Sequence, residues 1–288
     1  MCIHVVIDAS GTYSNPNYMG PGGLPAVGER RLRSLGRISH YIPTTVAGPL
    51  STVPITTAVI GSGASAITTI KMILERNENL STTGGAHSNI LWITRVPSDE
   101  APYQVIAGDS LPMRETLYSL ANSLASAGSA HARANVGGDT FLQYKCNSNI
   151  TKIEEVSQEG HDSSSLRLTL QPCGEENSHS NLETFDVHEV IANCGYHPDT
   201  FMTRELQVHY CYASEGPMKL AAAMLASSGG GSGDCLAQVL PGKETLRSPE
   251  ARFFVIGMKS YGRGSSFLLR IGYEQVEHVM ALLAEENF

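Results

Sequence analysis

The stretch Thr56-Thr57-Ala58-Val59-Ile60-Gly61-Ser62-Gly63-Ala64-Ser65-Ala66 decides the fold of this chain. A short β-prone run leads into the pattern G-x-G-x-x-A, and a helix-prone segment follows, which is typical of a dinucleotide-binding turn. Gly61 permits the tight turn, and Gly63 lets the backbone approach a pyrophosphate. Ala66 lets the helix lie close to the strand, with its N-terminus facing the phosphates. We therefore expect residues 61–66 to bind a dinucleotide, with Ser65 either reaching a phosphate or only capping the helix.

The next strand supplies a residue that discriminates between nucleotides. Residues 89–94 form an apolar run, and Arg95 follows it directly. An acidic residue at this place binds the ribose 2′-hydroxyl of NAD, whereas an arginine suits the 2′-phosphate of NADP through a charge-assisted fork. Arg95 therefore favours NADP over NAD, and the alternative is an ordinary surface arginine. We expect the polar residues 77–88 to be an exposed excursion that lengthens the connection.

Composition places the chain among ordinary soluble globular proteins of one large or two modest domains. Of its 288 residues, 41% are hydrophobic and 17% are charged, which permits a large core. The net charge of −8 argues against nucleic acid or an anionic membrane as a partner. No run is long enough to span a membrane, and no signal peptide is recognisable. Six scattered cysteines without a C-x-x-C pair fit free thiols in a cytoplasmic protein.

Strand and helix patterns alternate along the chain, which predicts an α/β fold with a parallel sheet. A Gly/Pro-rich loop is expected at 10–36, a domain connection at 44–54, a hydrophilic hairpin loop with His179 at 172–182, and a flexible connection at 227–233. Expected strands are 3–9, 38–42, 56–60, 89–94, 141–144, 149–157, 164–171, 185–193 and 253–256; expected helices are 64–76, 111–126, 217–226 and 267–284.

Two sharp strand exits resemble each other. The apolar strand 3–9 ends in Ala9-Ser10-Gly11 with Tyr13 and Pro16 beyond it, and the strand 185–193 ends in Cys194-Gly195 with Tyr196 and Pro198 beyond it. Such exits leave room for a ligand at the carboxyl edge of a sheet, and the plainer interpretation is two ordinary turns. A buried-type strand directly after Met1 also suggests an incomplete chain.

These motifs, in this order, resemble flavoproteins with two dinucleotide-binding domains, such as flavin-containing monooxygenases and thioredoxin-reductase-like oxidoreductases. The resemblance covers nearly the whole chain and is most specific at the glycine turn. The matching residues are Ala9-Ser10-Gly11, then Gly61, Gly63 and Ala66, then Arg95, then Asn193-Cys194-Gly195-Tyr196, then Gly257, and Lys259-Ser260-Tyr261-Gly262-Arg263.

The resemblance implies a Rossmann-like NAD(P)-binding domain, residues 50–189, inserted into a second, incomplete FAD/NAD(P)-binding-type domain, residues 1–49 and 190–288. NADPH would lie across Gly61–Ala66 with Arg95 on its 2′-phosphate, and FAD near Gly11, Gly195 and Tyr261. Two departures concern the flavin. No G-x-G-x-x-G precedes the first strand, and Gly257-Met258-Lys259 stands where related reductases have Gly-Asp. A sheet without its first βαβ unit would expose an apolar edge that favours association, including homo-oligomers.

Several other residues carry open alternatives. Tyr261, Arg263, Ser265 and Ser266 enter the last helix and either face a flavin or anionic ligand or form a capped helix start. Asp8 contacts a ligand hydroxyl or only forms a turn. For His40 we expect a structural or loop role, and for Cys194 and Cys235 buried packing.

The sequence therefore predicts an NADPH-dependent flavoprotein oxidoreductase that passes hydride to FAD and then to oxygen or another acceptor, acting on a small molecule. No residue stands out as a catalytic acid or base, and no metal site is expected. One alternative is a non-catalytic NADP(H)-binding module or sensor without flavin. Another is a degenerate product without activity.

Overall fold

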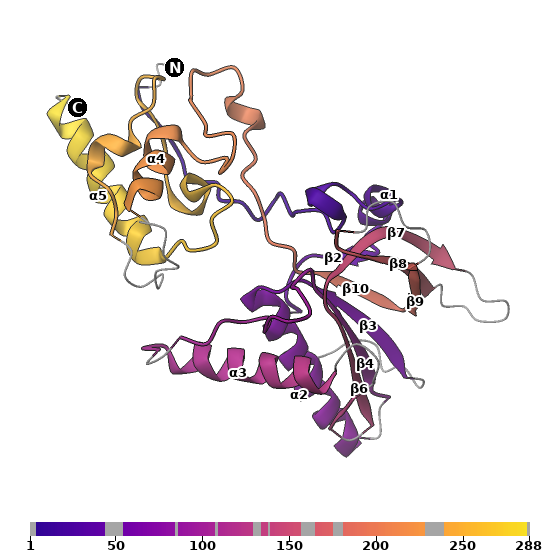
Figure 1. Ribbon diagram of the computed structural model, residues 1–288. Coiled ribbons are helices and arrows are strands. Elements are labelled where there is room, and N and C mark those ends of the chain that lie inside the picture. Colours follow the sequence, from indigo (N-terminus) through magenta and orange to yellow (C-terminus); the bar gives the residue numbers. More distant parts are fainter. Residues whose placement is uncertain are drawn as a thin grey trace. The chain divides into compact units, whose positions relative to one another are not determined.

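The chain folds into two compact units, each with its own core. The computed structural model describes residues 4–43, 54–83, 86–106, 109–128, 134–137, 139–156, 165–174, 181–227 and 239–286 (Figure 1). Unit 1 consists of Met1–Asn17 and Gly195–Phe288, and unit 2 of Tyr18–Cys194. The chain thus leaves unit 1 after Asn17 and returns to it at Gly195. The predicted α/β fold with a parallel sheet is confirmed.

The lead-in residues 18–43 belong to unit 2, so the unit begins well before residue 50. Strand β2 (Ile38–Ser39) pairs with β10 (Glu189–Ala192) in the sheet of unit 2. Val27 forms a bridge to Lys152, and the helix α1 (Glu29–Ser34) follows it. Most of the connection expected at 44–54 lies outside the described residues.

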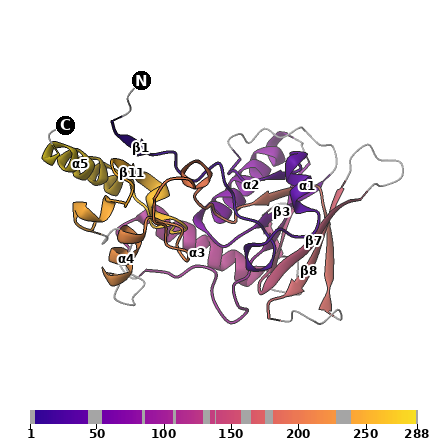
Figure 2. The ribbon, with the colours of Figure 1, turned by 90° about the horizontal axis from the view of Figure 1, so that it is seen from above.

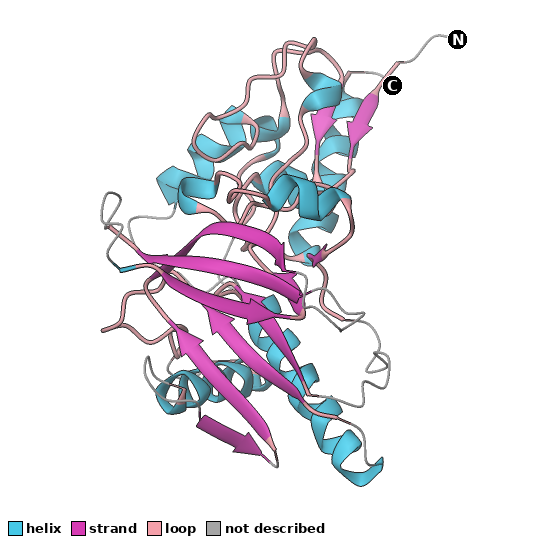
Figure 3. Ribbon diagram, turned by 90° about the vertical axis from the view of Figure 1, so that its right-hand side faces the viewer, coloured by secondary structure: helices cyan, strands magenta, loops and turns pink. Residues whose placement is uncertain are grey.

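The main sheet of unit 2 has six strands in the order β2-β10-β3-β4-β6-β5 (Figure 3). The strands not yet given are β3 (Ile55–Ile60), β4 (Ser88–Ile93), β5 (Ala134–Gly137) and β6 (Thr140–Lys145). All neighbours are parallel except the antiparallel pair of β5 and β6. The glycine-turn strand β3 therefore lies inside the sheet, between β10 and β4.

Both faces of this sheet are covered, which explains its continuous apolar strands. On one face lie α2 (Ala64–Thr83) and α3 (Pro112–Ala127), as Figure 1 shows. On the other lies an antiparallel sheet of β7 (Ser148–Val156), β8 (Ser165–Pro172) and β9 (Glu183–Val187). Along β3, Val59 joins the core under the helices, whereas Ala58 and Ile60 join the core under the antiparallel sheet. This is the two-residue periodicity of a strand.

Three predictions about elements need correction. Helix α2 runs to Thr83, so the expected exposed excursion at 77–88 is wrong in its first part. The single strand expected at 185–193 is two strands, β9 and β10, which belong to different sheets. The short helix α1 lies within the loop expected at 10–36, and β5 corresponds to no expected element.

Unit 1 contains a two-stranded parallel sheet of β1 (Val6–Asp8) and β11 (Phe253–Val255), with helices α4 (Met218–Ser227) and α5 (Leu269–Glu285) (Figure 2). Its core includes Leu220, Phe254, Ile271, Val279 and Leu282. Val6 and Ile7 are 42% and 44% exposed, so β1 presents the expected apolar edge. Short 3-10 turns in the described residues include Pro21–Gly23 in unit 2 and Phe201–Thr203, Lys243–Leu246 and Gly257–Tyr261 in unit 1.

None of the helices in the described part of the chain combines the length and the apolar character that a membrane span requires.

The length of α2 depends on a buried amide. The side chain of Asn77 donates to the carbonyl oxygen of Ser88 at 2.8 Å and to Thr140 Oγ1 at 2.9 Å, and it accepts from the N–H of Ser88 at 3.0 Å. A buried polar side chain with these bonds ties the helix to β4 and β6.

We predict that Asn77→Ala lowers the free energy of unfolding by about 3 kcal/mol, because it leaves the buried backbone of Ser88 without partners. Denaturant unfolding measures this. Glu78→Ala, on the exposed face of the same helix, is the control and should change stability by less than about 0.5 kcal/mol. Equal losses in the two variants would contradict the role of Asn77.

Candidate functional site

The turn between β3 and α2 is fixed by a close backbone approach at Gly61. Gly61 has φ +130°, and a Cβ built on it would lie 2.3 Å from the carbonyl oxygen of Asn193 at the end of β10. Its N–H donates to the carbonyl oxygen of Ile93 at 3.0 Å. Only glycine satisfies both the backbone angle and the space, as the sequence predicted.

Gly63, in contrast to Gly61, has room for a side chain. A Cβ built on Gly63 meets no atom within 4 Å, and its φ lies outside the left-handed region. Ser62, Gly63, Ala64 and Ser65 are exposed, whereas Ala66 is fully buried against the core. The protein itself therefore does not require a glycine at position 63. The space in front of Gly63, before the 20-residue helix α2, is therefore open, and helix N-termini in general favour anions.

Two aromatic side chains bind the carbonyl groups of this turn. Trp92 Nε1 donates to the carbonyl oxygen of Gly61 at 2.9 Å, and the hydroxyl of Tyr103 donates to the carbonyl oxygen of Gly63 at 2.7 Å. Sequence reasoning missed both residues. The available signal was the single tryptophan of the chain, placed in the strand next to the turn.

Arg95 lies at the carboxyl edge of the same sheet. It is exposed and follows β4, whose residue Ile93 is in register with Ile60 of β3. Burial raises the pKa of the Cys194 thiol to about 12, and the positive charge of Arg95 acts against this rise. The guanidinium thus lies near Cys194, which directly follows β10.

The predicted residues of unit 1 form a different arrangement. Gly11 and Gly195 both have positive φ, and the segments that follow them pair with each other. The rings of Tyr13 and Tyr196 meet edge to face with centroids 5.1 Å apart, and the N–H of Asn17 donates to the carbonyl oxygen of Gly195 at 3.0 Å. The structure brings these two exits together, but in the described residues neither leads directly from a strand through a glycine turn into a helix.

Tyr261 and Arg263 do not face a common site. Tyr261 is 4% exposed and packs on Phe267 in the core of unit 1, whereas Arg263 is exposed and pairs with Glu215 at 2.9 Å. Of the two alternatives, the capped helix start is wrong, because α5 begins only at Leu269 and neither Ser265 nor Ser266 caps it.

Asp8 is a buried ion-pair partner. Its carboxylate accepts from Lys259 Nζ at 2.7 Å and from the N–H of Ser10 at 3.1 Å. Burial acts to raise the pKa of Asp8, but the hydrogen bonds from Lys259 and Ser10 outweigh it and hold the pKa below its usual value. Since the side chain is engaged in this way, the turn-forming interpretation holds.

The other candidates have structural surroundings. Burial and the charge of Arg33 lower the pKa of His40, and a hydrogen bond with the backbone of Ala192 opposes them. Cys194 packs against the core of unit 2, as expected. Cys235 and His179 lie outside the described residues.

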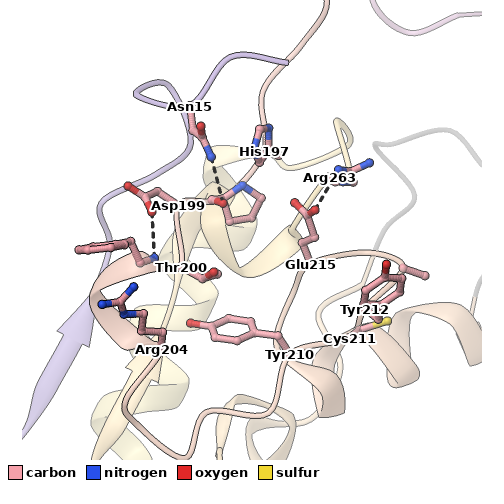
Figure 4. Close-up of a pocket in the computed structure, with 13 residues that line it drawn as sticks. Asn15, His197, Asp199, Thr200, Arg204, Tyr210, Cys211, Tyr212, Glu215 and Arg263 are labelled. Carbon is pink, nitrogen blue, oxygen red and sulfur yellow. Dashed lines mark hydrogen bonds and ion pairs between the residues drawn. The ribbon is translucent and has the colours of Figure 1, made fainter. Parts of the chain in front are cut away.

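Unit 1 also contains a cavity of about 850 Å³ that sequence analysis did not identify (Figure 4). Cys211 lines it. Hydrogen bonds from the side chain and backbone of Ser214 and from the backbone of Ala213 lower the pKa of Cys211. In Figure 4, the ring of Tyr210 lies between Arg204 and Cys211. The lining residues are Asn15, His197, Pro198, Asp199, Thr200, Phe201, Arg204, Tyr210, Cys211, Tyr212, Ala213, Glu215 and Arg263.

Comparison with solved structures identifies proteins of the same fold. The chain is similar to the bacillithiol disulfide reductase Bdr (YpdA) from Bacillus cereus, with 15% identity over 98% of this chain and 62% of that chain and a TM-score of 0.56. It is also similar to thioredoxin reductases from Lactococcus lactis (11% identity, 96% and 66% coverage, TM-score 0.51) and from T. acidophilum (11%, 99% and 66%, 0.52). No protein-family model and no curated protein matches the sequence. The chain therefore shares the fold of these reductases and spans 62–66% of their length.

An alanine substitution should affect stability very differently at the two glycines of the turn. Gly61→Ala should lower the free energy of unfolding by more than about 3 kcal/mol, because its Cβ overlaps Asn193 at an unfavourable φ. Gly63→Ala should change it by less than about 1 kcal/mol and weaken NADPH binding about tenfold. Denaturant unfolding and a binding titration of the two variants measure this. A Gly63→Ala variant that unfolds like Gly61→Ala would contradict the open space in front of Gly63.

The thiol of Cys211 should be more reactive than the thiol of Cys194. At pH 7.5 we expect iodoacetamide to alkylate Cys211 faster than Cys194, because a lowered pKa increases the thiolate fraction and a raised pKa removes it. Ser214→Ala removes one stabilising hydrogen bond, so the pH midpoint of Cys211 alkylation should move upward and its rate at pH 7.5 should fall about two- to fivefold. Peptide mass spectrometry assigns the sites. Equal rates at the two cysteines would refute this.

Proposed function

We propose that the chain is an NADPH-dependent oxidoreductase of the flavoprotein kind, with NADPH as hydride donor and FAD as acceptor. The observation that carries the proposal is the turn at residues 61–66. Gly61 is packed against Asn193, Gly63 faces open space, and the N-terminus of α2 is exposed at the edge of the sheet where Arg95 follows β4. The shared fold with a bacillithiol disulfide reductase and thioredoxin reductases supports it.

The residues of unit 2 fit the phosphates of NADPH. The backbone at Gly63 and the first turn of α2 would hold the pyrophosphate, since the helix N-terminus favours negative charge there. Arg95 would bind the 2′-phosphate through a charge-assisted fork, which selects NADPH over NADH. These groups bind and orient the nucleotide, and the nucleotide supplies the hydride chemistry.

The described residues of unit 1 do not provide an equivalent place for the pyrophosphate of FAD. The N–H of Gly257, directly beyond β11, donates to Gln275 Oε1 at 2.7 Å, and the carboxylate of Asp8 at the end of β1 is paired with Lys259. This observation also favours a second candidate, an NADP(H)-binding module that works without flavin.

A visible absorption spectrum separates the two candidates. The purified chain is mixed with FAD, and unbound flavin is removed. A retained band near ~450 nm that bleaches on addition of NADPH supports the oxidoreductase, because hydride transfer requires both cofactors close together. Absence of retained flavin rules out catalysis by this chain alone and favours the binding module.

We further propose that the electrons pass to oxygen or another acceptor, that a small molecule is the substrate, and that the protein is cytoplasmic and forms homo-oligomers.

Arg95 should set the preference for NADPH. We predict that Arg95→Ala raises the Kd for NADPH about 10- to 100-fold and leaves the Kd for NADH unchanged within about twofold, since a lost fork to phosphate costs about 1.4 to 3 kcal/mol. Calorimetric titration at two salt concentrations measures both. Arg31→Ala, which removes an exposed arginine paired with Glu155 elsewhere in unit 2, is the matched control. Equal loss for NADPH and NADH would contradict this role.

A further inference from the structure

The glycine turn depends on side chains that lie beneath it. We infer that Tyr103 is a positioning residue, whose hydroxyl holds the turn in the conformation that receives the pyrophosphate, with Trp92 as the second support. This inference rests on the proposed function, because it concerns how the same nucleotide site is kept ready for its ligand.

Both hydrogen bonds end on backbone carbonyl groups of the turn itself. Trp92 and Tyr103 donate to the carbonyl oxygens of Gly61 and Gly63, the two glycines of the motif. A carbonyl group that is held on the protein side fixes the plane of its peptide, and with it the direction of the next N–H. Peptide planes fixed before the ligand arrives lower the ordering cost of binding.

The hydroxyl of Tyr103 contacts both the glycine turn and the first turn of α2. Besides Gly63, its oxygen has the backbone N–H of Ile67 as a hydrogen-bond partner. The N–H of Ala66 also donates to the carbonyl oxygen of Gly63, at 2.9 Å. The hydroxyl therefore links the glycine turn with the start of the helix. Burial raises the pKa of Tyr103 well above its usual value, so the hydroxyl stays a donor throughout the physiological pH range.

Tyr103 is itself fixed in place, its backbone by Asn122 and its ring by Tyr118. The side chain of Asn122 on α3 donates to the carbonyl oxygen of Tyr103 at 2.9 Å and accepts from its N–H at 3.1 Å. The ring packs against Tyr118, with centroids 4.7 Å apart, and lies 6.4 Å from Trp92. Tyr103 is 5% exposed. Such a fixed side chain can impose its geometry on the turn, whereas a mobile one cannot.

A matched pair of variants separates positioning from plain stability. Tyr103→Phe removes the hydroxyl that contacts the turn. Tyr144→Phe removes the hydroxyl that bonds Thr94 Oγ1 at 2.9 Å, in a ring that packs on Trp92 at 4.6 Å without a hydroxyl contact to the turn. Tyr103→Phe loses two buried hydrogen bonds, to Gly63 and to Ile67, and Tyr144→Phe loses one, so both variants should be less stable than the wild type, with the larger loss in Tyr103→Phe.

The readout is built into the chain, because Trp92 is its only tryptophan. NADPH absorbs where tryptophan emits, so binding next to Trp92 should quench the emission and give the Kd directly. We expect Tyr103→Phe to raise the Kd for NADPH about tenfold and Tyr144→Phe to leave it unchanged within about twofold. Asn122→Ala, which leaves the hydroxyl of Tyr103 in place but frees its backbone, should shift the Kd in the same direction and serves if Tyr103→Phe does not fold.

The outcomes separate this inference from the proposed function. A wild-type chain that leaves NADPH unbound overturns the proposed function and the inference with it. Wild-type binding with equal Kd values in Tyr103→Phe and Tyr144→Phe overturns the inference alone. Loss of affinity in Tyr103→Phe but not in Tyr144→Phe, with both variants folded under the conditions of the titration, supports it.

Discussion

The close approach of Gly61 to the carbonyl oxygen of Asn193 is the constraint on which the proposed nucleotide site depends. It joins the carboxyl ends of β3 and β10, and no side chain fits between them. Asn193 also accepts a hydrogen bond from Thr69 on α2 through its side chain, at 2.9 Å in a buried position. One residue at the end of β10 thereby sets where the turn ends and how α2 leaves it. The space that remains lies on the outer side, in front of Gly63.

The two strands beside β3, β10 and β4, contribute different groups to the surroundings of this turn. β10 supplies the backbone against which Gly61 packs. β4 supplies Trp92 beneath the turn and ends next to Arg95 at its edge. The fold therefore converts one short motif into a shaped and charged surface by means of its neighbours in a parallel sheet, at the carboxyl edge where open α/β sheets bind ligands. Unit 1 uses its corresponding strand ends differently, since Lys259 and Gln275 occupy the polar groups there with internal hydrogen bonds.

The sequence was most informative where local pattern alone determines structure. The strand, glycine turn and helix at 56–76 follow from composition and spacing, and the structure contains all three. Glu29 shows why other parts were missed. Its buried carboxylate accepts from the backbone N–H groups of Met19 and Ala26 and orders a Gly/Pro-rich stretch into α1. Asn77 belongs to the segment 77–88 that the sequence predicts to be exposed. Its burial depends on hydrogen-bond partners in β4 and β6, which a local pattern does not reveal. The roles of Trp92 and Tyr103 likewise arise only when distant segments meet.

Hydrogen exchange measured by mass spectrometry, with and without NADPH, tests the central claim most directly, because it locates protection along the chain. Bound NADPH should slow exchange at the amides of residues 61–67 and around Arg95, where the phosphates would be held. Protection confined to unit 1, or no protection at residues 61–67 at a saturating NADPH concentration, would contradict the assignment of the glycine turn as the nucleotide site.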